Sequence, residues 1–321
     1  MIKINEKNIA LFPSKPRDSC NLMVLNLEEK KIIHSKFYNL HKFLKKGDLI
    51  IVNNTKVIPA KIFGRKNTGG KVEALFVKKI DEKRFYSLLK GKNVKNFYVG
   101  EFRLKVIGKN KFYIIEIENG NIDKLLKKYG KMPLPPYIKR EPVKKDEFYY
   151  NSIFAKKEGS IAAPTASLHF TERLIKKLKK EGIKVKELTL HIGPFTFLNN
   201  IEDEEIIKEF YEIPEETLME IEKTKKNGGR IISVGTTVTR ALETWGLTGK
   251  RKGYTDLIIK PGFEFKVSDI LLTNFHLENL SPILLTLAFV KDENLLRESY
   301  KEAIKRNYRF YSFGDAMLII P

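Results

Sequence analysis

Three of the five histidines in this 321-residue chain stand where catalytic groups are often found. His169 ends a run of small uncharged residues, GSIAAPTASLHF, while His191 and His276 follow the apolar runs LTL and ILLTNF. Because imidazole exchanges protons near neutral pH, each is a candidate acid or base, and each can equally be a hydrogen-bonded structural residue. No His-x-x-x-His pair is present and Cys20 is the only cysteine, so we expect no metal site.

The run before His169 favours close contact with a bound molecule. Glycine and alanine allow the backbone to approach a ligand, and serine and threonine add hydroxyl groups without bulk. A tightly packed core would require the same small residues. The candidate ligand contacts in this run are Ala163, Thr165 and Ser167.

The run SVGTTVTR places Gly235, Thr236 and Thr237 between a predicted strand and a predicted helix. Backbone N–H groups at a helix start can hold an anion or a carboxylate, and Arg240 could pair with the same group. Alternatively, Thr236 only caps the helix and Arg240 is a surface charge. The run lacks the lysine of a phosphate-binding Gly-x-x-x-x-Gly-Lys loop, and the chain has no Gly-x-Gly-x-x-Gly motif.

Other polar residues follow predicted strands. Asn53 and Asn274 could hydrogen-bond a ribose or a base edge, or only complete a turn. Near the C-terminus, Tyr308 and Arg309 could stack on a base, and Asp315 could accept a proton. Aromatic residues beside a terminal strand also commonly belong to a core.

Two patterns describe the elements that must position these residues. After residue 150 the chain alternates amphipathic helices with strands, which predicts a sheet covered by helices. Residues 61–149 contain short strands separated by turns and one helix at 122–129, which is typical of a small barrel. We predict an α/β main domain with a mixed sheet, formed by residues 1–60 and 150–321, and an inserted β-barrel domain at 61–149.

The chain is strongly basic. It has 60 Lys and Arg against 39 Asp and Glu, a net charge of +21 that attracts nucleic acid, although a lysine-rich composition spread over the surface would give the same sum. We expect no membrane span, because no window approaches about 18 uncharged apolar residues. The N-terminus lacks a signal-peptide core and Cys20 cannot form an internal disulfide, which indicates a cytoplasmic protein.

Eight ordered runs carry a family resemblance from residue 16 to residue 319. They are PRDSCNLMVL, GDLIIVNNTKVIPAKIFGRKNTGGKVEAL, MPLPPYIKR, NSIFAKKEGSIAAPTASLHFT, LTLHIG, GGRIISVGTTVTRALE, TNFHL and YRFYSFGDAMLI. Together they resemble the S-adenosylmethionine:tRNA ribosyltransferase-isomerase family of queuosine biosynthesis. The resemblance implies an enzyme that moves and isomerises the ribosyl group of S-adenosylmethionine onto 7-aminomethyl-7-deazaguanine at the tRNA wobble position. Epoxyqueuosine forms, adenine and methionine are released, and the partner is a tRNA carrying the precursor base; we expect a monomer.

The resemblance also implies roles. The sulfonium acidifies the 5′ carbon, so a base must remove a proton there, and adenine needs a proton or a hydrogen bond as it leaves. The candidates, in order, are His169, His191 and Asp315. The donor is expected to contact Ala163, Thr165, Ser167, Gly235, Thr236, Thr237, Arg240, Asn274 and His276. The tRNA side is expected to involve Asn53, Arg65, Lys66, Lys71, Arg140, Tyr308 and Arg309.

Three positions depart from the family pattern. Phe195 replaces a glycine after the second histidine, Glu278 replaces a proline, and Asn21 replaces an arginine. We expect Phe195 to narrow the pocket near His191. Two other functions stay open from sequence: a non-catalytic tRNA-binding protein, and an S-adenosylmethionine-dependent RNA methyltransferase, which would leave S-adenosylhomocysteine instead of methionine.

Overall fold

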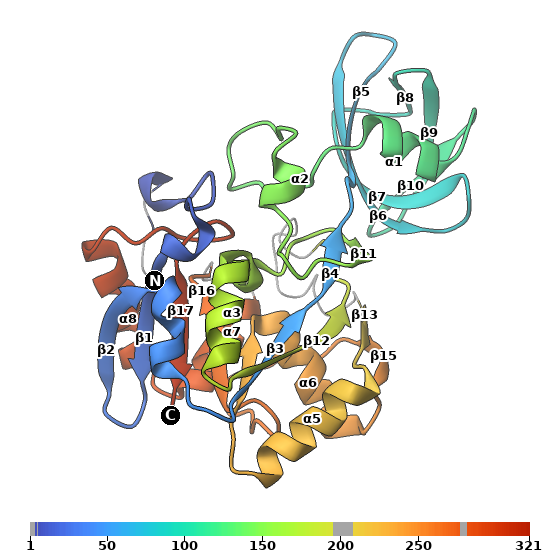
Figure 1. Cartoon of the computed structure of the whole chain (residues 1–321). Coiled ribbons are helices and arrows are strands. Elements are labelled where there is room, and N and C mark those ends of the chain that lie inside the picture. The colour runs from blue at the N-terminus through green and yellow to red at the C-terminus, as the bar shows by residue number, and fades with distance from the viewer. Residues whose placement is uncertain (1–3, 5, 195–207, 277–280) are drawn as a thin grey trace.

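The main domain is built on a nine-stranded sheet, shown in Figure 1. The computed structural model describes residues 4, 6–194, 208–276 and 281–321. In spatial order the strands are β15 (Lys252–Thr255), β13 (Glu209–Glu212), β12 (Lys184–Leu190), β3 (Leu49–Asn53), β14 (Ile231–Val234), β16 (Ile270–Asn274), β17 (Ala316–Ile320), β1 (Asn21–Asn26) and β2 (Lys31–Lys36).

The centre of this sheet is parallel and its flanks are mixed. β12, β3, β14 and β16 run parallel to one another, whereas β13 and β15 on one side and β17 on the other pair antiparallel with the next strand inward. β17 then pairs parallel with β1, and β1 pairs antiparallel with β2. Every residue of β3, β14 and β16 is buried, as expected for central strands covered on both faces. The predicted mixed sheet is confirmed.

Helices cover both faces of the sheet because alternate side chains of each strand point to opposite sides. Ile50 of β3 packs in the cluster that contains α3, and Ile51 packs in the cluster that contains α5 and α6. Thr171 caps α3 by accepting a hydrogen bond from the Leu174 N–H. The helices of the main domain are α3 (Glu172–Lys180), α5 (Glu215–Lys226), α6 (Thr236–Thr248), α7 (Ser281–Val290) and α8 (Glu293–Lys305), with 3-10 helices at Glu6–Asn8, Arg17–Ser19, Phe37–Phe43 and Thr165–His169.

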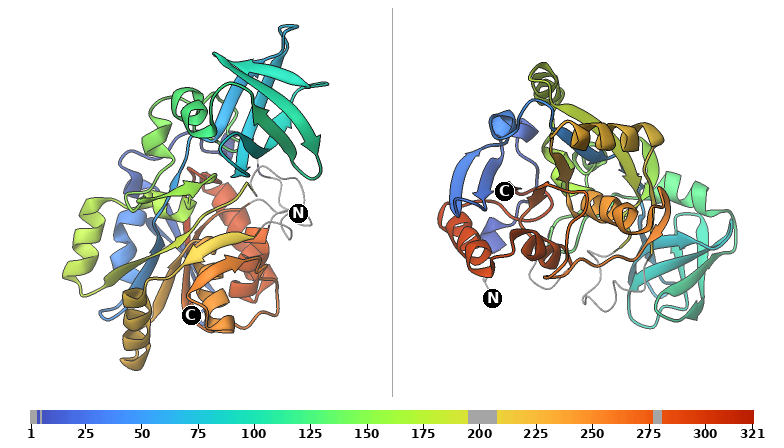
Figure 2. Two further views of the ribbon diagram at one scale, coloured as in Figure 1. Left: turned by 90° about the vertical axis from the view of Figure 1, so that its right-hand side faces the viewer. Right: turned by 90° about the horizontal axis from the view of Figure 1, so that it is seen from below.

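A closed barrel of six antiparallel strands lies at one end of the molecule, as both views of Figure 2 show. Asn121 caps the helix beside it, α1 (Ile122–Tyr129), by accepting a hydrogen bond from the Lys124 N–H at 2.9 Å. The barrel and this helix are confirmed. The strands lie inside the predicted 61–149 insertion, whose boundaries stay a prediction; in spatial order they are β10 (Tyr113–Ile117), β7 (Arg84–Lys90), β6 (Lys71–Lys79), β5 (Lys61–Arg65), β8 (Asn96–Val99) and β9 (Phe102–Lys109).

The two segments that connect the barrel to the main domain lie side by side. β4 (Thr55–Val57) leads out of the main domain and pairs in parallel with β11 (Lys157–Ser160), which leads back. The proline-rich connection is packed rather than free, since Met132, Leu134 and Ile138 share a core cluster with residues of the main domain. A short helix, α2 (Asp146–Tyr149), follows this connection. None of the helices in the described part of the chain is long and apolar enough to cross a membrane.

Candidate active site

A pocket lies at the carboxyl ends of the central parallel strands. Because parallel strands end at one edge of the sheet, the segments that follow β14 and β16 meet there, together with residues 162–166. The lining includes Tyr137, Tyr150, Ala163, Thr165, Glu209, Gly235, Thr236, Thr237, Arg240, Thr273, Asn274, His276, Tyr311 and Ser312. Eight of the nine residues predicted to contact the donor therefore line one pocket, and Ser167 is buried just beyond this lining, with its hydroxyl unpaired among the described residues.

The N-terminus of α6 forms one wall of the pocket. Gly235 precedes the helix with φ of +90°, a conformation that favours glycine and turns the chain sharply from strand to helix. Thr236 is the first helical residue of α6. The N-cap is therefore Gly235 and not Thr236, the cap considered from the sequence. The Thr237 hydroxyl is buried and has no hydrogen-bond partner within the described residues. A buried hydroxyl at the positive end of a helix suits a polar or anionic ligand group.

Asn274, at the end of β16, forms another wall. Its Nδ2 donates to the carbonyl oxygens of Tyr311 at 3.3 Å and Asp315 at 3.4 Å, which fixes the orientation of the amide. The same Nδ2 lies 3.1 Å from His169 Nε2. With Nδ2 so engaged, Oδ1 is the free acceptor of this side chain, and no other described residue bonds to it.

His169 lies behind Asn274 and outside the pocket lining. Since Nε2 faces the N–H of Asn274, it must accept, which places the proton on Nδ1 facing Cys20 Sγ at 3.3 Å. Burial lowers the pKa of His169 to about 3, and the positive charges of Arg309 and Arg17 add to this shift. The imidazole is therefore neutral at physiological pH. It contacts the pocket lining by its hydrogen bond with the Asn274 side chain.

His191 also lies outside the pocket lining, one residue before Ile192, which is part of it. Its Nδ1 is 2.8 Å from Thr55 Oγ1, and burial followed by the charge of Lys157 lowers its pKa. The sequence run GSIAAPTASLHF begins here: a Cβ on Gly159 would come within 2.8 Å of the His191 ring. The glycine is thus explained by close contact with this histidine.

His276 is the one candidate histidine that lines the pocket as far as the chain is described. Its Nε2 lies 2.7 Å from Thr273 Oγ1, and its backbone N–H donates to the Tyr300 hydroxyl at 2.8 Å. Burial lowers the pKa of His276 to about 4, so this imidazole is neutral near pH 7 and a weaker base than a solvent-exposed imidazole.

A buried ion pair between Arg240 and Glu209 forms a further part of the lining. Arg240 Nε also donates to the Leu257 carbonyl at 2.8 Å, and Glu209 Oε1 accepts from the Gly193 N–H at 2.6 Å. Burial raises the pKa of Glu209, and Arg240 opposes this shift. Arg240 is therefore not the surface charge that the sequence left open. Glu209 is not predicted from the sequence, because nothing in the local pattern EFYE marks it.

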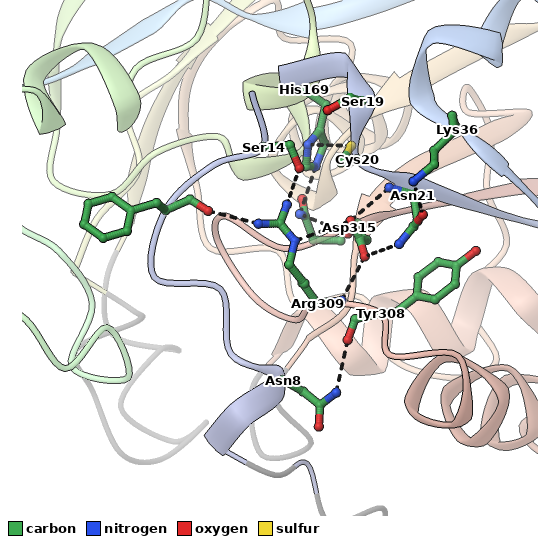
Figure 3. A network of polar contacts seen from close by, with 12 residues as sticks. Asn8, Ser14, Ser19, Cys20, Asn21, Lys36, His169, Tyr308, Arg309 and Asp315 are labelled. Atoms are coloured by element: carbon green, nitrogen blue, oxygen red, sulfur yellow. Dashed lines mark hydrogen bonds and ion pairs between the residues drawn. The ribbon is translucent and has the colours of Figure 1, made fainter. Parts of the chain in front are cut away.

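Asp315 lies at the centre of a network outside the pocket lining, shown in Figure 3. Its carboxylate accepts from the Asn21 backbone N–H and Nδ2, both at 2.9 Å, and from the Arg309 N–H at 2.8 Å. The Arg309 side chain bonds Ser14 Oγ and donates to the Phe12 carbonyl at 3.1 Å. This network ties the N-terminal segment to β17, and it uses Asn21, one of the three departures from the family pattern.

Three other residues that were predicted to contact the tRNA form hydrogen bonds within the protein. Asn53 is fully buried between β3 and β12, where its side chain bonds both the N–H and the carbonyl of Leu190. The Tyr308 hydroxyl lies 2.9 Å from His34 Nδ1, and burial raises the pKa of Tyr308. Arg140 forms two bonds of 2.7 Å with the buried Asp146 carboxylate.

The remaining predicted tRNA contacts lie at the tip of the barrel. Arg65 and Lys71 are exposed at the ends of β5 and β6, and Lys66 donates from Nζ to the Lys92 carbonyl at 2.9 Å. Phe195 and Glu278 lie outside the described residues. Across the residues that the structure describes, no group of three or more His, Cys, Asp or Glu could hold a metal ion.

Fold and pocket together define an α/β protein with an inserted barrel and a pocket at the carboxyl edge of its sheet. Residues 2–319 match the family model described as queuosine biosynthesis protein, and the chain belongs to this family. It is 44% identical to a protein of Sulfurihydrogenibium sp. over 97% of this chain and 96% of the relative. It is 43% identical to one of Aquifex aeolicus over 99% and 98%. Both are named S-adenosylmethionine:tRNA ribosyltransferase-isomerase.

A solved structure gives the same result. The crystal structure of S-adenosylmethionine tRNA ribosyltransferase from Thermotoga maritima matches with a TM-score of 0.60 and 33% identity, over 99% of each chain. The family resemblance read from the eight sequence runs is confirmed.

Proposed function

We propose that this protein transfers and isomerises the ribosyl group of S-adenosylmethionine onto 7-aminomethyl-7-deazaguanine at the tRNA wobble position, releasing adenine and methionine. Family membership and the relatives' names support the reaction class. The observation that carries the proposal is the pocket, whose walls come from the runs that resemble the family. These walls hold Thr237 Oγ1 and Asn274 Oδ1, two polar groups without a hydrogen-bond partner among the described residues.

The chemistry of these groups fits the donor. S-adenosylmethionine presents a ribose diol, an adenine amino group, an ammonium and a carboxylate. Asn274 Oδ1 accepts from a hydroxyl or amino group, and the Thr237 hydroxyl both donates and accepts. Arg240 is the proposed partner of the methionine carboxylate, which would then share the guanidinium with Glu209.

For proton removal we propose a revised order of candidates. His169, His191 and Asp315 lie outside the described pocket lining, whereas His276 is part of it. We assign His276 as the base that accepts the 5′ proton made acidic by the sulfonium, and His169 as a positioning residue that holds the Asn274 amide. We further propose that the protein acts on tRNA as a monomer in the cytoplasm.

The test is a mass assay with precursor tRNA and S-adenosylmethionine. We expect adenine, methionine and epoxyqueuosine-tRNA in equal amounts. S-adenosylhomocysteine with methylated tRNA would instead show a methyltransferase, and tight salt-sensitive tRNA binding without donor turnover would show a non-catalytic RNA-binding protein.

A Thr237→Val variant tests the pocket itself. Removal of one hydrogen bond to the donor should raise KM for S-adenosylmethionine by about 2- to 10-fold and leave KM for tRNA unchanged. Thr248→Val is the matched control, because Thr248 is exposed at the far end of the same helix. An unchanged KM for the donor in Thr237→Val would remove this threonine from the site.

A further inference from the structure

An exposed aromatic patch joins two segments that are far apart in the chain. Phe12 is 44% exposed and Phe148 is 66% exposed, and Leu11 and Val143 are exposed on the same two segments. Tyr149 links the two phenylalanines, with ring centroids 6.4 Å from Phe12 and 6.0 Å from Phe148. We call these five residues the aromatic patch. Contiguous exposed apolar surface of this kind marks an interaction site more often than a scattered exposed side chain does.

A positively charged side chain lies over each of the three rings of the aromatic patch. Arg140 lies 4.0 Å from the Phe12 centroid, Arg17 lies 4.3 Å from Phe148, and Lys15 lies 5.8 Å from Tyr149. Segments 11–17 and 139–149 together contain six Lys or Arg and three Asp or Glu. One of these acids, Asp146, is buried and paired with Arg140. The patch therefore combines flat apolar rings with a surplus of positive charge.

The patch adjoins the outer side of the pocket wall. Tyr150, the next residue after Tyr149, is fully buried and lines the pocket. On the other segment, the Phe12 carbonyl accepts from Arg309, two residues before Tyr311, which also lines the pocket. Figure 1 shows the N-terminal segment beside the loop that leads to α2. A polymer whose reacting unit enters the pocket would bring its neighbouring units to this surface.

We propose that the aromatic patch binds RNA, by stacking with unpaired nucleotides that flank the wobble base of the substrate tRNA. This inference rests on the proposed function. An enzyme that reacts on one base must take it out of its stack, and the flanking bases then need another flat surface. Aromatic rings supply that surface for any base. Arg17 and Arg140 are engaged within the protein, so the exposed Lys15, Lys144 and Lys145 are the side chains proposed to pair with the phosphates.

A Phe148→Ala variant tests the inference. Loss of one stacked base should weaken precursor-tRNA binding by about 5- to 150-fold and leave KM for S-adenosylmethionine unchanged. Phe148→Tyr should restore the affinity, because it keeps the ring. Met219→Ala is the matched control: Met219 is 65% exposed, on α5, which packs against the sheet away from the aromatic patch.

A spectroscopic readout gives a second, independent test. The chain contains one tryptophan, Trp245, so Phe148→Trp adds a reporter at the patch. A stacked base should quench this second tryptophan when an anticodon stem-loop is added, beyond any change in the parent protein. A fully paired RNA of equal length should quench it less.

The outcomes separate this inference from the proposed function. If the parent protein releases adenine and Phe148→Ala binds tRNA within twofold of it, the proposed function stands and the patch inference is wrong. If the parent protein releases no adenine, the proposed function fails by itself. If Phe148→Ala changes self-association in light scattering and not RNA affinity, the patch is a protein interface and the inference is overturned.

Discussion

Replacement of His169 by glutamine should make the protein less sensitive to acid. Glutamine can present an oxygen to Asn274 Nδ2 in place of His169 Nε2, but it has no site for an added proton. The pKa of His169 is lowered to about 3 in the folded protein, against about 6.5 in an unfolded chain. The folded state therefore excludes a proton that the unfolded state binds.

The sign and the size of the effect follow from linkage. The contribution of neutral His169 is fully present above pH 6.5 and is lost as pH falls from 6.5 toward 3. Between pH 7 and pH 5 the parent protein should lose about 2 kcal/mol of unfolding free energy through this one group, and His169→Gln should not. Urea unfolding of both proteins at the two pH values measures the difference.

The same variant separates a positioning role from a catalytic one. If His169 only holds Asn274, turnover of His169→Gln should stay within about tenfold of the parent, because the contact to the amide is kept. Removal of a general base should cost about 100- to 10,000-fold. Equal acid sensitivity of the two proteins, or a loss of turnover of the second size, would refute the reasoning.

Two further predictions concern the frame and the barrel. Asp315→Asn should lower the free energy of unfolding by about 1–3 kcal/mol, because one of the three N–H groups that donate to the carboxylate loses its acceptor. The KM for S-adenosylmethionine should not change. A raised KM for this donor in a variant of unchanged stability would contradict the structural role. Alanine at Arg65, Lys66 and Lys71 together should reduce the slope of log Kd for tRNA against log salt by about 2 to 3; an unchanged slope would place the barrel tip away from the RNA.

Much of the pocket could be predicted from the sequence because many of the residues that line it directly follow strands. The runs before Gly235 and Asn274 are mostly apolar, as expected for central strands, and the carboxyl ends of parallel strands meet at one edge. Polar residues directly after such runs were therefore expected to share a site, and they line one pocket. Their individual roles stay predictions.

The order among the candidate bases could not be read from the sequence. His169 and His276 each follow a small or apolar run, yet one lies behind Asn274 and the other lines the pocket. The difference depends on which residues from other segments stand in front of each ring. Asp315 likewise seemed free to accept a proton, until folding brought Asn21 to it from the other end of the chain.

The sequence by itself determined the layers of this protein, since strand and helix periods, caps and turns depend on residues that are close in the chain. The barrel, α1 and the small-residue run all follow from such local patterns. The tertiary structure alone decided which distant side chains meet: Glu209 with Arg240, and Phe12 with Phe148 through Tyr149. Such contacts depend on the register of the sheet and on how separate segments pack, which no local pattern encodes.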